Sequence, residues 1–569
     1  MKLAAVFLLL CTVAMAQSSD SNKESKADAI FHHGNIYTGV KERSSFGETL
    51  QRAEAIAIRG GRIVAVGKDD EIVKWKGLQT QVIDLGGRFV MPGFNDAHVH
   101  LAEAGFQKLS VNLVGVKSLE EFRQRIRNKV ASAAPGEWIT GGGWDETLWP
   151  VKATPTRWDV DEVSQGHPVF LQRVDGHIGV ASTKALQLAS VTVASRNPEG
   201  GKIDRDEAGT PTGILRETAR DAVFAAIPKP THDKRKQAIE AALADAAQWG
   251  ITSAQDNSSW DDFQIYEELE HQGELPIRIS EWLPFDASVE GLKSMRDSHP
   301  QSDNMLHTGM LKGFMDGSLG SHTAALLEPY ADDPKNSGLP RYEPERLNEM
   351  AAERMEAGFQ LGFHAIGDKG VQLALDAFEG GEKDARAQNV KGPNGSQDFR
   401  LRIEHAQVTT PAEIDNFKAL KVIASMQPNH LLTDMNWAQA RLGPKRAAHS
   451  YAWAEFLRKG VTLAFGTDYP VEPVTPFRGL YAAVTRKSED GKAEYFPEQK
   501  LTIDQAIAAY TTGSAFAEFA EKDKGTLQTG MLADFVVLDR DITAVTPQKI
   551  LDTKVLRTVV GGKTVYKVR

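Results

Sequence analysis

The sequence predicts an α/β protein: a (β/α)8 TIM barrel joined to a small β-sandwich that both chain ends build. Three observations predict it. Short apolar runs alternate with helix-forming stretches through the middle of the chain. Both ends instead contain alternating, strand-like segments. Polar residues, mostly histidines, stand at the carboxyl ends of the apolar runs, where barrel active sites lie.

The first residues indicate export. Lys2 precedes an apolar stretch over 3–13, and Ala14-Met15-Ala16 forms a small-x-small cleavage site. We therefore expect residues 1–16 to be a signal peptide, with a secreted or periplasmic mature protein that starts near Gln17. A retained N-terminal anchor is the alternative. The only cysteine, Cys11, lies in this segment, so disulfides and a thiolate nucleophile are excluded in the mature chain.

Both ends are expected to fold together. The segments 17–90 and 526–569 share strand-like alternation, and each contains a Gly-Gly pair between two such runs. Gly60-Gly61 and Gly561-Gly562 therefore predict tight hairpins. We expect these two segments to form one composite β-sandwich.

The middle of the chain, 91–525, alternates helices and strands. Thr231 is a good N-cap residue for a helix that ends at Trp249. Eight strand-like runs give eight repeats, which predicts the closed barrel. These runs are one ending at His98 and those over 251–255, 277–282, 310–315, 360–364, 401–405, 422–426 and 461–466.

Spacing locates an insertion. A repeat of a typical barrel takes roughly 31 residues, and His405 and Asp468 are 63 residues apart, which fits two repeats. By contrast, 153 residues separate His98 from Ile251, the start of the next strand. We therefore expect an inserted subdomain over 104–228, after the first barrel strand. An insertion at that end of a strand is expected to overhang the active site.

Six side chains at these strand ends could form one metal cage. His98 and His100 lie two apart, so both face one side of a strand. Imidazoles and a carboxylate are good zinc ligands. Individually, the histidines are as consistent with surface or structural positions, and an aspartate there with a helix N-cap. Together they predict a site with two divalent metals, most simply zinc, although manganese, iron or cobalt suit the same ligands. The six are His98, His100, Lys312, His364, His405 and Asp468.

Lys312 is the unusual member because a lysine in an apolar strand would bury an unpaired ammonium. One interpretation is a buried ion pair with Asp316. The other is carboxylation of the lysine by CO2, which gives an anionic carbamate whose two oxygens can bridge two metals. Asn95 and Asp96, just before the histidine pair, are expected to orient the imidazole rings.

The motifs resemble those of the amidohydrolase superfamily, in the YtcJ-like branch called the amidohydrolase 3 family. The resemblance covers the whole mature chain and implies one metal on His98, His100 and Asp468 and a second on His364 and His405. Carboxylated Lys312 would bridge them. This chain has His322 where the family pattern has arginine. The motifs are MPGFNDAHVH, GWDETLWP, PVFLQRVDGH, LKGFMDGSLGS, HAIGD, RIEHAQ and GTDYPVEP.

The ligands suggest the chemistry. A hydroxide bridging the two metals would attack a carbonyl, and Asp468 would act first as general base and then as general acid. His177 and His430 are further catalytic candidates, expected to donate hydrogen bonds to the substrate carbonyl. The candidate substrate-binding residues are Trp144, Asp145, Asp175, Asp316 and His322. His177 paired with Asp175, and Trp144 as a packing residue, are the alternatives.

We expect a hydrolase of amide-like C–N bonds, such as N-acyl, N-formyl or cyclic amides. The same site on an ester or carbamate, or in a deaminase, stays open. So does a non-catalytic binding protein on this scaffold, although no ligand is lost here. DGSLGS lacks the G-x-S-x-G pattern of a serine hydrolase. A small-molecule substrate is expected. The net charge of −10 without a basic stripe argues against nucleic acid. No stable membrane association is expected after signal removal, and oligomerisation is left open.

Overall fold

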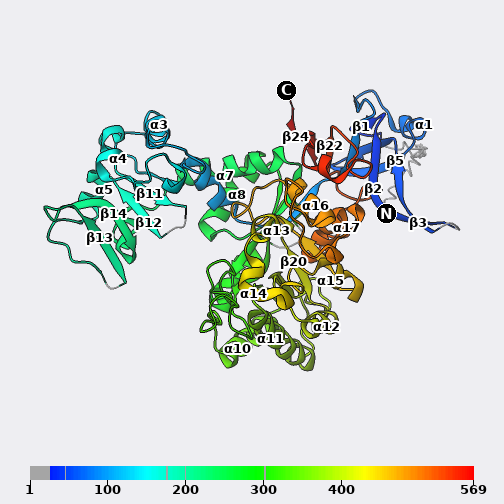
Figure 1. Ribbon diagram of the computed structural model, residues 1–569. Coiled ribbons are helices and arrows are strands. Elements are labelled where there is room, and N and C mark those ends of the chain that lie inside the picture. The colour runs from blue at the N-terminus through cyan, green and yellow to red at the C-terminus, as the bar shows by residue number, and fades with distance from the viewer. Residues whose placement is uncertain (1–25, 45–46, 175–176, 199, 300–302, 569) are drawn as a thin grey trace, which may run out of the picture.

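Eight parallel strands form a barrel at the centre of the molecule (Figure 1). This computed structural model describes residues 26–44, 47–174, 177–198, 200–299 and 303–568. The barrel strands pair in chain order, and a parallel bridge between Val99 and Tyr469 joins the last strand's end to the first. The predicted (β/α)8 fold class is therefore confirmed. The strands are β8 (Phe94–Val99), β15 (Ile251–Asp256), β16 (Arg278–Pro284), β17 (Leu306–Phe314), β18 (Leu361–Ala365), β19 (Arg402–His405), β20 (Ile423–Met426) and β21 (Leu463–Phe465).

Helices follow the strands and cover the barrel. The predicted helix after Thr231 is α7 (His232–Gln248), and the Thr231 hydroxyl accepts a hydrogen bond from the backbone N–H of Lys234. One face of α7 is apolar at helical spacing and buried, which explains why the helix forms there. The other barrel helices are α2 (Leu101–Leu109), α8 (Trp260–His271), α9 (Val289–Ser298), α10 (Pro344–Glu356), α11 (Asp368–Ala387), α12 (Pro411–Leu420), α13 (Pro428–Asp434), α14 (Ala438–Ala447), α15 (Trp453–Lys459), α16 (Pro476–Thr485), α17 (Ile503–Ala508) and α18 (Ser514–Ala517).

The two chain ends meet in one sheet. Six strands run in the order β24-β23-β22-β7-β2-β3, and β22 pairs antiparallel with β7. A second sheet, β5-β4-β1-β6, comes from the N-terminal part alone and packs on the first, with Phe31 and Phe535 in edge-to-face contact at 4.9 Å. The strands are β1 (Ala29–His32), β2 (Asn35–Ser44), β3 (Gly47–Ala53), β4 (Ala55–Arg59), β5 (Arg62–Gly67), β6 (Gln81–Asp84), β7 (Phe89–Pro92), β22 (Phe535–Leu538), β23 (Val555–Val560) and β24 (Lys563–Lys567), with the short helix α1 (Asp69–Ile72).

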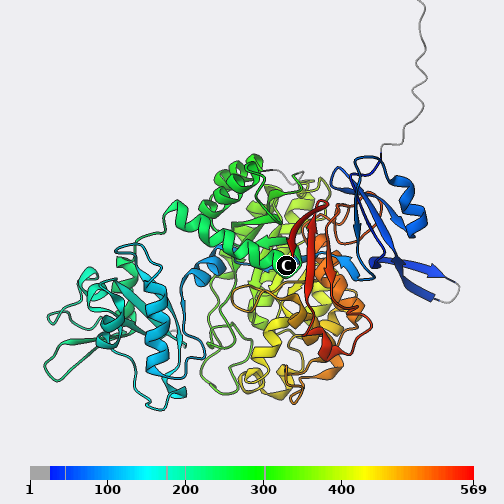
Figure 2. The ribbon, with the colours of Figure 1, turned by 90° about the horizontal axis from the view of Figure 1, so that it is seen from above.

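The long connection after α2 folds into a separate inserted domain. Its six-stranded sheet, in the order β13-β14-β12-β11-β10-β9, has its own hydrophobic clusters. Among the described residues, one ion pair joins it to the barrel, between Lys234 Nζ and Glu137 Oε1 at 2.8 Å. It lies to one side of the barrel in both views (Figures 1 and 2). Its elements are β9 (Val111–Asn112), α3 (Leu119–Val130), β10 (Ile139–Trp144), α4 (Arg157–Ser164), β11 (Val169–Arg173), β12 (Ile178–Ala181), α5 (Thr183–Leu188), β13 (Gly201–Arg205), β14 (Pro211–Glu217) and α6 (Asp221–Ala226).

The predicted signal peptide over 1–16 and Cys11 lie outside the described residues. No helix within the described ranges has the length and apolar character needed to span a membrane.

Candidate metal centre

The structure brings the six predicted ligands together at the carboxyl ends of the barrel strands. The rings of His98 and His100 are 5.3 Å apart, and His405 lies 4.9 Å from His98 and 4.5 Å from His364. Lys312 Nζ lies 3.4 Å from His98 Nε2. Asp468 Oδ1 lies 3.6 Å from the same nitrogen. Residues up to 370 positions apart in the sequence therefore share one centre.

Hydrogen bonds fix which ring nitrogen carries the proton. His98 Nδ1 is 2.8 Å from a Glu404 carboxylate oxygen, and His100 Nδ1 is 3.2 Å from the carbonyl oxygen of Asn257. His405 Nδ1 is 2.7 Å from the side-chain oxygen of Gln427. Each oxygen only accepts, so each Nδ1 donates. The Nε2 lone pairs of these three histidines are left for a metal.

His364 has the opposite arrangement. Its Nε2 lies 3.1 Å from the carbonyl oxygen of Gly317 and donates to it, which leaves the lone pair on Nδ1. Burial lowers the pKa of His364 to about 3 and that of His98 to about 4, with the Lys312 charge adding to both effects. Burial also holds the pKa of His405 well below its ordinary value. These rings are neutral at pH 7, as metal binding requires.

Asp468 is the acidic member of the centre. Its Oδ1 lies 3.2 Å from His100 Nε2, and it is buried without a hydrogen-bond donor among the described residues. Its Oδ2 lies 3.0 Å from His430 Nε2. Burial raises the pKa of Asp468, but the nearby histidines outweigh burial and lower that pKa well below its ordinary value. Burial lowers the pKa of His100, but its hydrogen bond to Asp468 and the charge of that residue outweigh burial and raise the pKa. The Asp468 carboxylate and the Nε2 atoms of His98 and His100 lie close enough together to hold a metal ion.

Lys312 lies deep in the barrel and is only 3% exposed. No carboxylate of the described residues lies within ion-pair distance of its Nζ, which sits 5.1 Å from the ring centre of Trp282 and 5.0 Å from that of Phe314. Burial lowers the pKa of Lys312 to about 8. The alternative of a Lys312–Asp316 ion pair is therefore wrong.

The backbone at the centre takes conformations that non-glycine residues seldom adopt. His405, Ala406 and Asp468 all have left-handed backbone, with φ of 72°, 40° and 59°. A left-handed backbone raises the conformational energy of a residue with a side chain, and such strained residues are concentrated at functional sites. Gly466 permits the close approach of β21 to β8, because a Cβ there would lie 2.5 Å from the His98 nitrogen. Asp468 N–H can therefore donate to the His98 carbonyl at 2.8 Å.

Four further residues predicted from sequence contact other groups of the protein in the structure. Asp316 accepts backbone N–H bonds from Ala325, Ile366 and Gly367, so its carboxylate ties loops together and is not free for substrate. His322 pairs with Asp332 at 3.0 Å. Asn95 and Asp96 were expected to orient imidazoles. Instead, Asn95 donates to Glu518, and Asp96 accepts from Thr467 and the His98 backbone.

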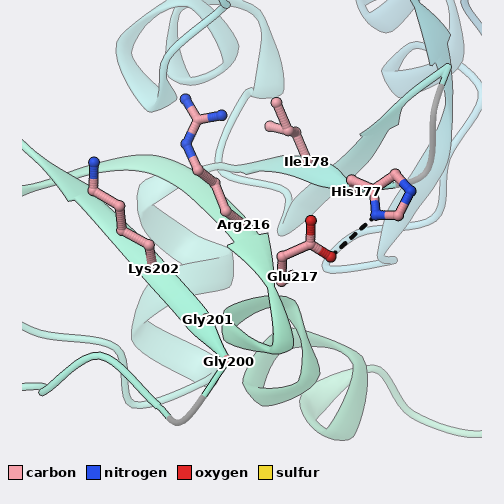
Figure 3. Close-up of a pocket in the computed structure, with 7 residues that line it drawn as sticks. All are labelled: His177, Ile178, Gly200, Gly201, Lys202, Arg216 and Glu217. Atoms are coloured by element: carbon pink, nitrogen blue, oxygen red, sulfur yellow. Dashed lines mark hydrogen bonds and ion pairs between the residues drawn. The ribbon is translucent and has the colours of Figure 1, made fainter. Parts of the chain in front are cut away.

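The candidates on the inserted domain do not reach the centre. Trp144 is fully buried in that domain's own core, against Phe122, so the packing interpretation holds. Asp145 accepts hydrogen bonds from Thr147 and Arg173. His177 is 66% exposed and lies 3.1 Å from Glu217 at a surface hollow of about 520 Å³ (Figure 3). Asp175 lies outside the described residues. The expected overhang of the inserted domain above the ligands stays a prediction.

His430 is the outer candidate that does reach the centre. Its Nε2 meets Asp468 Oδ2, and its ring lies 6.0 Å from that of His405. Burial lowers the pKa of His430, but the hydrogen bond to Asp468 and that residue's charge outweigh burial and raise the pKa to about 9. His430 therefore donates to Asp468.

Comparison with known proteins places the chain in a family. The sequence profile described as "Amidohydrolase family" matches residues 81–566. The chain belongs to the amidohydrolase family. It is 34% identical to Protein LONG AFTER FAR-RED 3 of Arabidopsis thaliana, over 99% of this chain and 97% of that protein. It is 31% identical to YtcJ of Bacillus subtilis, named as a candidate amidohydrolase, over 95% of this chain and 99% of that one.

Two further matches are informative. An N-substituted formamide deformylase of Arthrobacter pascens is 26% identical over 90% of this chain and 95% of its own length. The crystal structure of an uncharacterised metal-dependent hydrolase from Pyrococcus furiosus superposes with a TM-score of 0.74 at 31% identity, over 90% of this chain and 99% of that one. The amidohydrolase resemblance is therefore confirmed, and the chain is a metal-dependent hydrolase of this family.

Proposed function

We propose that this amidohydrolase cleaves amide-like C–N bonds of small molecules, such as N-acyl, N-formyl or cyclic amides. The observation that carries the proposal is the convergence of acceptors around Asp468 Oδ1. That oxygen lies 3.2 Å from His100 Nε2 and 3.6 Å from His98 Nε2, while the protons of both rings are held elsewhere. Such a set of acceptors suits a divalent cation.

The residues fit a pair of metals. His98 Nε2, His100 Nε2 and Asp468 Oδ1 would hold one, and His364 Nδ1 and His405 Nε2 would hold the second. Lys312, carboxylated by CO2, would supply an anionic bridge where the unmodified chain has an unpaired amine. Zinc suits nitrogen and carboxylate donors of this kind. When bound, such ions polarise a carbonyl and make a water a stronger nucleophile at neutral pH.

Asp468 moves the proton in the proposed reaction. Its carboxylate takes a proton from the attacking water and returns it to the leaving nitrogen. His430 Nε2 donates to Oδ2 and holds the carboxylate in one orientation. The lowered pKa of Asp468 favours this role, because the base must be free of its proton before the attack.

The choice of an amide rests on the family and on one relative. The Arthrobacter pascens protein is named for N-substituted formamides, and it matches 90% of this chain. The ligands themselves do not distinguish an amide from an ester, a carbamate or a deaminase substrate. These other substrates are therefore outcomes of the test below.

We also propose export to a secreted or periplasmic location, with cleavage after residue 16. Its support is the sequence alone, with Lys2, the apolar stretch and Ala14-Met15-Ala16. N-terminal sequencing of the protein from its natural host tests it. A mature start near Gln17 supports export, and an intact Met1 in the cytosolic fraction contradicts it.

The catalytic proposal is tested with protein loaded with Zn²⁺ in bicarbonate buffer. Substrate loss and product formation are followed by chromatography for N-formyl, N-acyl and cyclic amides, and in parallel for matched esters, carbamates and aminopurines. Asp468→Asn is the inactive variant, and Asp145→Asn, on the inserted domain, is the matched control. Turnover of an amide by wild type and the control but not by Asp468→Asn supports the proposal. Turnover of esters or aminopurines alone contradicts the amide assignment.

A further inference from the structure

A buried carboxylate that belongs to none of the predicted ligands touches the metal centre. Glu404, in β19, is completely buried. Its Oε2 accepts from His98 Nδ1 at 2.8 Å and from the hydroxyl of Ser425 at 2.8 Å. Its Oε1 accepts from Nε of Arg402 at 2.6 Å. Both oxygens of the carboxylate are therefore occupied, one by the ligand histidine and the other by an arginine.

Arg402 lies two residues before Glu404, so the strand directs both side chains to the barrel interior. Its guanidinium donates to the Ala97 carbonyl and to Ser425, both at 2.9 Å, and also to the Gln255 side chain. These contacts reach β8, β20 and β15. The arginine is thus fixed from three other strands and cannot turn away from Glu404 without leaving several buried groups unpaired.

Glu404, held by Arg402, determines which ring nitrogen of His98 carries the proton. An imidazole carries its proton on either nitrogen, and only the other nitrogen can bind a metal. Because a carboxylate can only accept, Glu404 requires the proton of His98 on Nδ1. The lone pair then lies on Nε2, which points towards Lys312 Nζ at 3.4 Å and Asp468 Oδ1 at 3.6 Å.

His98 also depends on this contact for its ring angle. The ring packs edge-on against Trp282 at 4.8 Å and lies beside His405 at 4.9 Å. Packing of this kind restricts the ring but does not distinguish its two nitrogens. Glu404 is the group among the described residues that binds His98 Nδ1 most closely, with the Gln427 amide farther away at 3.4 Å.

We propose that Arg402 and Glu404 form a positioning pair that presents His98 Nε2 to the metal, with Glu404 setting the tautomer and Arg402 holding Glu404 in place. The inference rests on the metal site of the proposed function and names residues outside it. Neither residue touches substrate, so both are positioning residues. A carboxylate that binds a metal-ligating histidine raises metal affinity, because it fixes the tautomer and the orientation of the imidazole ring.

Two variants test the pair. Glu404→Gln keeps the shape, but an amide has one acceptor oxygen. If that oxygen faces Arg402, the amide N–H₂ faces His98 Nδ1 and moves the ring proton to Nε2. The double variant Arg402→Met/Glu404→Met removes both charges together and so leaves no unpaired buried ion. The acceptors of Arg402 on Ala97, Gln255 and Ser425 lose a donor, so the stability of this variant is measured as well. Asp534→Asn is the matched control, because Asp534 forms another buried carboxylate–arginine pair, with Arg278 at 2.6 Å, away from the centre.

The readout is the Zn²⁺ affinity of each folded protein, measured by competition with a chromogenic chelator, with the absorption spectrum of the Co²⁺ form as a second signal. Unfolding of the metal-free proteins is measured alongside. We expect about 10- to 100-fold weaker Zn²⁺ binding and an altered Co²⁺ spectrum in both pair variants. Asp534→Asn should lower stability but keep wild-type affinity and spectrum.

Wild-type affinity in both pair variants would overturn the inference, as would an equal loss of affinity in Asp534→Asn. Failure of the wild-type protein to bind metal would refute the proposed function instead, and with it the basis of this inference. Activity is not used as the readout, so a wrong choice of substrate cannot mimic either result.

Discussion

Replacement of Lys312 by methionine should stabilise the metal-free protein while destroying its metal site. Lys312 is buried, and no described carboxylate pairs with it, which lowers its pKa from 10.5 to about 8. At about 1.4 kcal/mol per pH unit, that drop corresponds to about 3 kcal/mol of unfavourable free energy for the buried ammonium at pH 7. Methionine has a similar length and no charge. The Lys312→Met protein, stripped of metal and CO2, should therefore resist unfolding better by up to about 3 kcal/mol.

The stability difference between wild type and Lys312→Met should also depend on pH. A lysine whose folded pKa is depressed has its full cost below that pKa, because both states are then protonated and only the folded state buries the charge. The cost disappears as the pH rises from about 8 towards the ordinary lysine pKa of 10.5. Urea unfolding of both proteins with a chelator in CO2-free buffer, at pH 7 and pH 10, measures this. A wild type as stable as Lys312→Met at pH 7, or a gap that stays constant to pH 10, would refute the reasoning.

Three further predictions follow from the centre. In Asp468→Asn, kcat on any accepted substrate should fall by about 10²- to 10⁴-fold, because the proton acceptor is lost; steady-state kinetics measures this, and residual activity above a tenth would contradict it. Dialysis against a chelator should abolish hydrolysis, and Zn²⁺ with bicarbonate should restore it; activity that survives complete metal removal would argue against the site. Trp144→Ala should destabilise the inserted domain by about 3–5 kcal/mol through the cavity it leaves, seen as faster hydrogen exchange in 111–227, while the metal content stays at the wild-type level.

The barrel and its ligands could be predicted because their signals are local. Each strand is a short apolar run, and a histidine, lysine or aspartate at its end is visible without knowing any partner. The barrel topology then brings these ends to one mouth, so His98 and Asp468 could be related across 370 positions.

The groups that hold the ligands could not be predicted, because they depend on contacts between strands. Glu404 is adjacent to His405 in sequence, yet it serves His98, which is 306 positions away. Asp96 is near His98 in sequence, yet its carboxylate accepts a hydrogen bond from the hydroxyl of Thr467 rather than from the ring of His98. The sequence pattern identifies a buried carboxylate but not the partner that barrel closure gives it.

The inserted domain explains why two predicted site residues lie away from the metal centre. Trp144 and His177 were related to the metal centre through motifs, but the inserted domain has its own core and is tied to the barrel by one described ion pair. A tryptophan beside a strand end buries itself in the nearest apolar core. The sequence placed Trp144 on the insertion, but it did not show that the side chain packs in the insertion's own core rather than facing the metal centre.

The central claim is that six side chains hold two cations around a carboxylated lysine. The most direct measurement is metal stoichiometry by mass spectrometry on protein loaded in ¹³C-bicarbonate, combined with ¹³C NMR of the same sample. We predict two divalent metals and one carbamate carbon per wild-type chain, with the carbamate signal absent and the metal content reduced in Lys312→Met. A wild-type chain that takes up fewer than two metals, or that takes up two without a carbamate signal, would contradict the claim.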